Sequence, residues 1–182
     1  WLKRDPVHLE QVVKSLDDII HEGRRAGEII RGLQALTRNQ SSEFVPASLH
    51  TITREIITLS RLELERRAVS LELNLAAQNE TILGQNVQIQ QVLLNLAINA
   101  IEAMGDNTGP RILKISSYNP SSDLISIDVA DSGTGLSEEV IDKIFDSFYT
   151  TKAEGMGMGL TISHAIIKRH GGLLSAENRP EG

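Results

Sequence analysis

The sequence predicts an α+β fold in which a layer of helices packs on a mixed β-sheet, preceded by a long N-terminal helix. Two observations support this prediction. Segments with helical and with strand periodicity alternate between residues 43 and 176, and the first 40 residues keep one helical periodicity throughout. Interleaved helices and strands favour helices layered on a sheet.

The N-terminal residues predict one helix whose apolar side chains form a seam. These apolar and small residues, spaced alternately by three and four, are Leu9, Val12, Leu16, Ile19, Gly23, Ala26, Ile30 and Leu33. A helix of about thirty residues is long for a globular core, so we expect it to belong to a helical bundle or a coiled coil. A polar break at residues 39–42 predicts a boundary between a first part, residues 1–40, and a domain over residues 41–182.

The second part of the chain predicts an alternation of strands and helices. The expected strands are 43–45, 69–75, 111–118, 123–130 and 173–176, and the expected helices are 48–66, 87–104, 137–144 and 158–169. Residues 69–75 alternate apolar and polar side chains with a period of two, which is typical of a half-buried strand. A turn-rich link at residues 119–122 separates two strands, and Gly171-Gly172 ends the last helix.

Composition excludes several classes of function. The chain has 182 residues, 40% of them hydrophobic, which suffices for one ordinary domain and an appended element. A net charge of −6 without a long basic run argues against nucleic-acid binding. The absence of cysteine excludes disulfides, thiolate metal sites and a catalytic thiol.

The sequence also bears on location and completeness. No apolar run approaches the roughly 20 residues of a membrane-spanning helix, so we expect no membrane contact here and a cytoplasmic location. Any membrane anchor of the full-length protein would lie outside this sequence. Because the chain starts at Trp1 inside a helical pattern and ends at Gly182 in a turn-like segment, we expect a fragment of a longer protein.

The helix expected at 87–104 carries a polar stripe along an apolar body. Gln88, Gln91, Asn95, Asn99 and Glu102 follow one another at steps of three, four, four and three, so they share one face. Asparagine is a poor helix former, and a buried amide needs hydrogen-bond partners. Two asparagines one turn apart therefore indicate either a polar cleft with an ion, since amide oxygens suit Mg²⁺, or a buried amide network. The helix alone does not decide between them.

Two glycine-rich loops follow. Asp-Ser-Gly-Thr-Gly-Leu at 131–136 comes directly after a strand, where an ordinary turn explains the glycines as well as a ligand does. Gly-Met-Gly-Met-Gly-Leu at 155–160 opens a helix, and its three alternating glycines favour a phosphate site over a flexible loop. Lys152 lies just upstream and could meet a phosphate. Between the loops, residues 144–152 hold three of the chain's five Phe and Tyr residues, which alone would indicate a hydrophobic plug in the core.

Together and in this order, four segments resemble the N box, first glycine box, F box and second glycine box of the sensor histidine kinase catalytic domain. They read Asn-Leu-x-x-Asn-Ala, Asp-x-Gly-x-Gly, Phe-x-x-Phe-x-Thr-Thr-Lys and Gly-Met-Gly-Met-Gly-Leu. This domain belongs to the GHKL, or Bergerat-fold, ATPase superfamily, and the resemblance covers about residues 43–182. It implies a two-layer α/β sandwich with helices on one face of the sheet. Residues 1–40 resemble the second helix of the dimerisation and phosphoacceptor hairpin, only part of which is present.

The resemblance implies ATP and Mg²⁺ as cofactors. It makes Asn95, Asn99 and Lys152 the catalytic residues, with Asn99, supported by Asn95, holding the metal. Asp131 would bind the adenine amine, and residues 145–160 would form a short lid. The cofactor-binding residues that it implies are Asn95, Asn99, Asp131, Gly133, Gly135, Thr151, Lys152, Gly155, Gly157, Gly159 and Leu160.

The implied reaction is transfer of the γ-phosphoryl group of ATP to a histidine on the hairpin, for relay to an aspartate of a response regulator. The implied partners are thus the hairpin of the same kinase, a homodimer at full length, and a response regulator. Asn95 stands where gyrase-like and chaperone-like relatives carry a water-activating glutamate. An amide cannot act as a base, which favours transfer over hydrolysis. A non-catalytic binding module is a further alternative, but it predicts degraded boxes, whereas all four are intact.

The sequence departs from the resemblance in three places. None of the five histidines has the phosphoacceptor context, so we expect surface or packing roles for all of them; they are His8, His21, His50, His164 and His170. Gln85 stands near the position where the family often has an aspartate. The family's last strand would follow Gly182, which predicts an open sheet edge.

Overall fold

The computed structural model describes residues 11–16, 19, 23, 43–105, 107–152 and 155–179. It contains two compact units, Trp1–Gln40 and Ser41–Gly182. Within the first unit, residues 11–16 are helical, and most of the long helix expected there lies outside the described residues. The candidate boxes all belong to the second unit.

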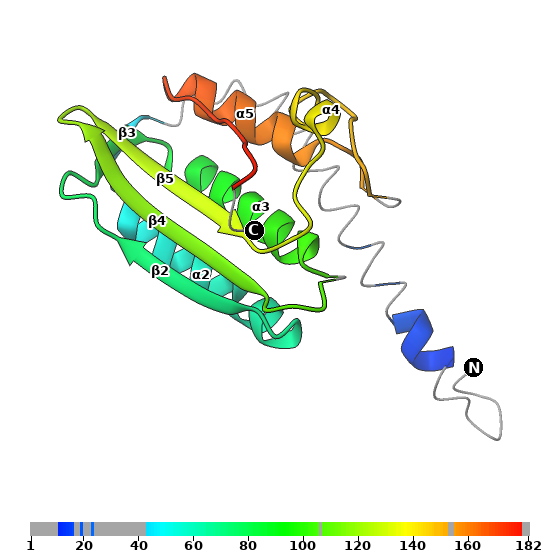
Figure 1. The fold of residues 1–182 in the computed structure, drawn as a ribbon. Helices are drawn as coiled ribbons and strands as arrows, with labels where there is room; N and C mark the ends of the chain where they lie inside the picture. Colours follow the sequence, from blue (N-terminus) through cyan, green and yellow to red (C-terminus); the bar gives the residue numbers. More distant parts are fainter. Residues whose placement is uncertain are drawn as a thin grey trace. The chain divides into compact units, whose positions relative to one another are not determined.

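The second unit is a mixed sheet with helices on one face (Figure 1). Its strands are β1 (Val45–Ser48), β2 (Ser70–Leu75), β3 (Thr81–Gly84), β4 (Ile112–Ser121) and β5 (Leu124–Asp131), and its helices are α2 (Leu49–Arg66), α3 (Asn86–Ala103), α4 (Glu138–Ile141) and α5 (Gly159–Arg169). The main sheet has the order β2-β4-β5, with β2 parallel and β5 antiparallel to β4. Strands β1 and β3 form a separate antiparallel pair. The predicted α+β fold with helices layered on a mixed sheet is therefore confirmed, while the long N-terminal helix stays a prediction.

Helix α3 occupies the centre of the helical layer because its apolar residues face two clusters. Ala97, Ile101 and Met104 pack against Leu113 and Ile115 of β4. A second cluster joins the first half of α3 to α2 and β1; its buried members are Ala47, Leu49, Ile52, Ile56, Ile89 and Leu93. Helix α5 packs on α3 as well. These contacts fix the rotation of α3 and leave its polar stripe beside α5 and the lid segment.

Two differences from the expected elements lie at the sheet. Strand β3 was not predicted, because its four residues are too few to show a period. Strand β4 continues through the residues expected to link it to β5, and its register with β5 shifts between Tyr118 and Ser121. This irregularity accommodates Pro120, which has no N–H to donate to the ladder.

The expected helix at 137–144 and strand at 173–176 are also corrected. Helix α4 covers only Glu138–Ile141. Residues 173–179 form no strand, and Leu173 is 86% exposed. Side chains rather than a backbone ladder hold this closing segment, since Arg179 pairs with Asp128 of β5 at 3.0 Å. Within the described residues β5 is thus an edge of the sheet.

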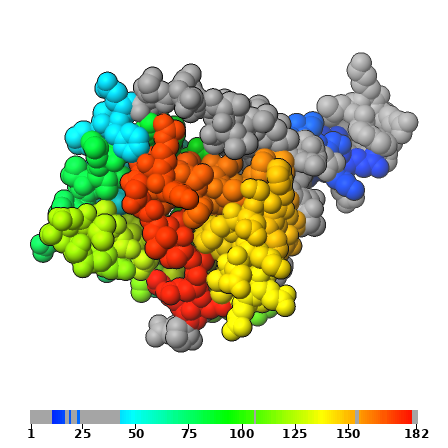
Figure 2. Space-filling view, turned by 90° about the horizontal axis from the view of Figure 1, so that it is seen from above, coloured from blue at the N-terminus to red at the C-terminus, as the bar shows by residue number. Residues whose placement is uncertain are grey.

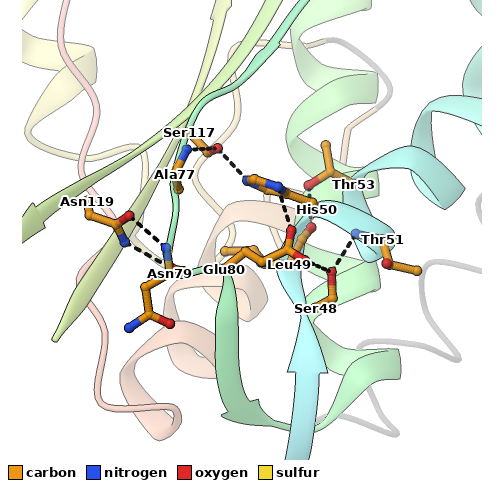
Figure 3. A network of polar contacts seen from close by, with 10 residues as sticks. All are labelled: Ser48, Leu49, His50, Thr51, Thr53, Ala77, Asn79, Glu80, Ser117 and Asn119. Atoms are coloured by element: carbon orange, nitrogen blue, oxygen red, sulfur yellow. Dashed lines mark hydrogen bonds and ion pairs between the residues drawn. The ribbon is translucent and has the colours of Figure 1, made fainter. Parts of the chain in front are cut away.

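A polar network joins the main sheet to the small β1–β3 pair (Figure 3). His50 of α2 meets Glu80 through Nδ1 at 2.5 Å and Ser117 of β4 through Nε2 at 2.7 Å. Ser48 donates to the other carboxylate oxygen of Glu80 at 3.0 Å, and the Ala77 amide donates to Ser117 Oγ at 3.3 Å. Each polar group of this network has a partner within the protein.

The described histidines have the packing roles expected of them. Besides His50 in its network, the His164 ring stacks on Phe145 with centroids 5.3 Å apart. His170 Nε2 accepts a hydrogen bond from the Gln85 amide at 3.0 Å, and its ring lies 4.8 Å from that of Phe44. His8 and His21 lie outside the described residues.

Candidate functional site

The polar stripe of α3 meets the lid at Asn99. Lys152 Nζ donates to Asn99 Oδ1 at 2.9 Å and also pairs with the Glu102 carboxylate. Asn99 is half-buried, while the side chains of Glu102 and Lys152 are 38% and 44% exposed. This end of the stripe therefore lies at an accessible surface, as the cleft interpretation requires, and is not an amide network closed inside the core.

Asn95, one turn earlier, lies against α5. Its Nδ2 donates to Ser163 Oγ at 3.0 Å, and Ser163 is 1% exposed. Its Oδ1 would lie 2.5 Å from a Cβ added at Gly159, so a side chain there would force Asn95 to move from its present position. The glycine thus lets the start of α5 approach Asn95 in the conformation that bonds to Ser163.

The loop after β5 lies at the C-terminal end of α3. Asp131 Oδ1 accepts a hydrogen bond from the Gly133 amide at 2.8 Å. A Cβ at Gly133 would lie 2.8 Å from the carbonyl oxygen of Ala103, the last residue of α3. The glycine therefore lets the loop contact the helix end directly, and it fixes the half-buried Asp131 carboxyl beside that end.

The closing segment holds the far side of the same loop. Gly135 has φ +71°, a left-handed conformation that glycine favours. Asn178 accepts from the Leu136 amide at 2.9 Å and donates to the Leu136 carbonyl at 2.6 Å. Figure 2 shows the closing segment (red) lying against the segment that contains α4 (yellow). Asn178 thus fixes the loop that follows the first glycine box.

The F box is tied to α5 rather than to the sheet. Thr161 Oγ1 of α5 donates to the Asp146 carbonyl at 3.0 Å, and Phe145 stacks on His164 as described above. Phe148 has φ +67° and is 75% exposed. The expectation of a hydrophobic plug in the core is therefore wrong for Phe148, whose ring projects to the surface because its backbone turns there.

The second glycine box needs its glycines for close backbone approach. A Cβ at Gly157 would lie 2.4 Å from the Tyr149 carbonyl oxygen, and one at Gly155 would lie 2.7 Å from Thr150 Oγ1. Helix α5 starts at Gly159, and its N-cap, Met158, makes no side-chain capping bond. The first amides of α5 thus have no side-chain cap, which suits an anion at the positive end of the helix dipole.

The structure brings some of the expected site residues together and separates others. Lys152 contacts Asn99, and Asn95 contacts Gly159, so the N box, the lid and the second glycine box converge. Asp131 and the first glycine box lie at the C-terminal end of α3, where Gly133 approaches Ala103, and no described contact joins them to Lys152 or Asn95. Thr151 is exposed, and its hydroxyl makes no hydrogen bond within the described residues, while Leu160 is half-buried.

Sequence reasoning missed three residues that shape this site. Glu102 stood on the predicted stripe without a role, although its step of three from Asn99 placed it on the same face. Asn178 lies just after the strand expected at 173–176 and was given no role. No signal in the sequence marked Ser163, since the pairing of its hydroxyl with Asn95 spans 68 residues.

The described residues contain no cluster of three or more His, Cys, Asp or Glu side chains arranged to hold a metal ion. None of their helices has the length and apolar character needed to cross a bilayer.

At Glu63 of α2, burial would raise the pKa of the carboxyl, but hydrogen bonds and charge from Arg66 and Arg67 outweigh the effect of burial and lower that pKa.

Comparison with known proteins fits this geometry. The family of histidine kinase-, DNA gyrase B- and HSP90-like ATPases matches residues 84–182, which include all four boxes. The chain is 36% identical over 185 residues to the sensor histidine kinase TmoS of Ectopseudomonas mendocina, and 37% identical over 172 residues to the sensor protein FixL of Bradyrhizobium diazoefficiens. These alignments cover 100% and 94% of this chain but only 19% and 34% of the relatives.

Solved structures similar to this chain belong to the same class of protein. The nucleotide-free catalytic domain of histidine kinase ThkA superposes with a TM-score of 0.68 at 33% identity, covering 76% of this chain and 90% of that one. A structure of ThkA in complex with the response regulator TrrA gives 0.77 at 28% identity, covering 98% of this chain and 50% of that one. Fold and boxes thus define a Bergerat-type ATP-binding domain. The chain belongs to the histidine kinase-, DNA gyrase B- and HSP90-like ATPase family, with its relatives among the sensor histidine kinases.

Proposed function

We propose that this chain is the ATP-binding catalytic part of a two-component sensor histidine kinase. It transfers the γ-phosphoryl group of ATP to a histidine on a dimerisation hairpin, for relay to an aspartate of a response regulator. The observation that carries the proposal is the cationic contact at the N box, where the Lys152 ammonium lies 2.9 Å from Asn99 Oδ1, one turn after Asn95, which faces the uncapped start of α5. The sensor kinase names of TmoS and FixL, and the ThkA complex with its response regulator, support the same reaction.

The residues present fit magnesium at the N box. Asn99 Oδ1 faces a cation in this structure, the Lys152 ammonium, and an amide oxygen is a hard ligand suited to Mg²⁺. Asn99 would hold the metal, with Asn95 in support because Ser163 fixes its amide. When bound, magnesium would supply neutralisation of the phosphate charge.

The polyphosphate and the base would lie along α3. The amides at the start of α5, with Gly155, Gly157 and Gly159, form the phosphate side together with Lys152 and Thr151 of the lid. Leu160 would pack beside them. The adenine would lie toward the C-terminal end of α3, where Asp131 would receive its amine and the loop of Gly133 and Gly135 would shape the pocket.

The chain's own residues favour transfer over hydrolysis. Asn95 occupies the position from which a carboxylate would activate water, and its amide is engaged by Ser163. Catalysis would thus rest on positioning and on neutralising charge. The nucleophile would be the hairpin histidine, and we propose that residues 1–40 are part of the second helix of that hairpin. The full-length protein would then be a homodimer whose kinase part lies in the cytoplasm.

Two measurements test the proposal. In the first, calorimetric titration with a non-hydrolysable ATP analogue should show binding that is tighter with magnesium. In the second, radiolabelled ATP should pass its terminal phosphate to a separately made acceptor hairpin. Hydrolysis without transfer would contradict the kinase function, and a folded protein without either activity would favour a non-catalytic module.

The variant Asp131→Asn sharpens the first measurement. It keeps the size of the side chain but removes the charge that would receive the adenine amine, so analogue affinity should fall about tenfold. The free energy of unfolding should change much less, since the carboxamide oxygen of the new side chain could still accept from the Gly133 amide. A variant that binds the analogue as tightly as the wild type would remove the adenine role of Asp131.

A further inference from the structure

The candidate metal ligand and the lid lysine are joined by a side chain that the proposed function leaves unused. Glu102 lies three residues after Asn99 on the same face of α3. The Lys152 ammonium contacts both, donating to Asn99 Oδ1 at 2.9 Å and pairing with the Glu102 carboxylate. The position of the ammonium beside Asn99 therefore depends on an acidic group that faces the site.

A lid lysine needs such an anchor. The residues before Lys152, from Ser147 to Thr151, form turns and bends without a helix or strand to fix them. A lysine side chain has four rotatable bonds and loses much freedom when it is held in one place. If the side chain has already lost this freedom in the nucleotide-free protein, the loss does not weaken nucleotide binding.

We propose that Glu102 is a positioning residue that holds the Lys152 ammonium beside Asn99, where it would meet the polyphosphate of ATP. The proposal rests on the function proposed above. A carboxylate repels phosphate, so Glu102 can favour nucleotide only through the cation that it places. With both side chains more than a third exposed, the pair contributes little to the stability of the fold.

A double-mutant cycle tests whether Glu102 acts through Lys152. The probe is magnesium with a non-hydrolysable ATP analogue, titrated calorimetrically into the wild type, Glu102→Gln, Lys152→Met and the double variant. Glu102→Gln should raise Kd about three- to tenfold when Lys152 is present, the size of one charge-assisted contact. It should have no further effect in the Lys152→Met background.

A second readout needs no nucleotide. In the free protein, acetylation of Lys152 by an amine-directed reagent, followed by peptide mass spectrometry, should be several-fold faster in Glu102→Gln than in the wild type. Lys168 on α5 is exposed and serves as the reference amine within the same sample. Glu65→Gln is the matched control, because it breaks the exposed Arg61–Glu65 pair on α2, outside the site. It should change neither Kd nor the acetylation of Lys152.

The outcomes separate this inference from the proposed function. Absence of analogue binding in the folded wild type would overturn the proposed function and this inference together. If the wild type binds but Glu102→Gln weakens binding equally in both backgrounds, Glu102 acts directly, for example on the metal, and only the positioning role falls. An unchanged Kd, or an unchanged rate of Lys152 acetylation, would overturn the inference as well.

Discussion

Two polar clusters of this domain each join a basic side chain to a glutamate, and they differ in what surrounds them. The network of His50, Glu80 and Ser117 lies between the two sheets, with its hydroxyl, imidazole and carboxylate all bonded inside the protein (Figure 3). The cluster of Lys152, Asn99 and Glu102 lies at the surface between the lid and α3. The first is a closed network in the sense that its polar groups bond to one another and that Ser117 and His50 are largely buried, whereas the second offers its oxygens and its ammonium to an incoming group.

Because of this difference, we expect the first network to contribute mainly to the stability of the fold and the second cluster mainly to ligand binding. Ser117 is 2% exposed and the His50 side chain is 14% exposed, so water cannot easily replace a partner that either of them loses, whereas the Glu80 side chain, at 36%, keeps access to water. In the lid cluster, water can replace any lost contact, and the same change costs little in folding. Substitutions in the two clusters should thus affect different measurements.

Asn99→Asp is the strongest test at the lid cluster. It places a second carboxylate beside Glu102, which would hold Lys152 more tightly and repel the phosphates. We expect phosphotransfer to the acceptor hairpin to fall about 100-fold, the scale of losing one preorganised group at a reacting centre. The free energy of unfolding, measured with urea, should change by less than about 0.5 kcal/mol because Asn99 is only half-buried. Normal phosphotransfer would remove Asn99 from the metal site.

His50→Ala tests the closed network. It leaves Glu80 and Ser117 without their shared partner and opens space between α2 and β4, so we expect a loss of about 2 kcal/mol in urea unfolding. Analogue affinity under conditions where the variant is folded should stay within about twofold of the wild type. A large loss of affinity at unchanged stability would show that the two clusters are coupled, and the comparison between them would fail.

The sequence predicted those elements whose pattern of apolar and polar residues reflects which of their faces is buried. The stripe on α3 was visible because Asn95 and Asn99 interrupt an apolar helix, and the sheet followed from strands such as 69–75 that alternate. The closed network was invisible, since its members come from α2, the segment before β3 and the middle of β4, and only tertiary packing brings them together. The same holds for Ser163 beside Asn95. Leu173-Leu174 was misjudged as a strand because its hydrophobicity says nothing of a ladder partner.

Glu63 of α2 is a third charged side chain that can be compared with the two clusters. Its substitution should have the smallest effect of the changes considered. The Glu63 side chain is 17% exposed and pairs with Arg66 at 2.9 Å and Arg67 at 2.7 Å. Burial would raise the pKa of Glu63, but the two arginines outweigh it and lower the pKa below that of an unfolded glutamate. Because the folded-state pKa is depressed, the stabilisation is present above the unfolded pKa and is lost as pH falls through the folded pKa.

The wild type should therefore exceed Glu63→Gln in free energy of unfolding by about 1 kcal/mol or less at pH 7. This difference should shrink toward zero as the pH is lowered through the acidic range in which Glu63 takes up its proton. Urea unfolding of both proteins across that range, with Glu65→Gln as the exposed control, measures the change. A difference that stays constant with pH would mean that Glu63 stabilises the end of α2 by packing rather than by charge. Glu63 would then differ from both clusters, whose contacts depend on polar and charged groups.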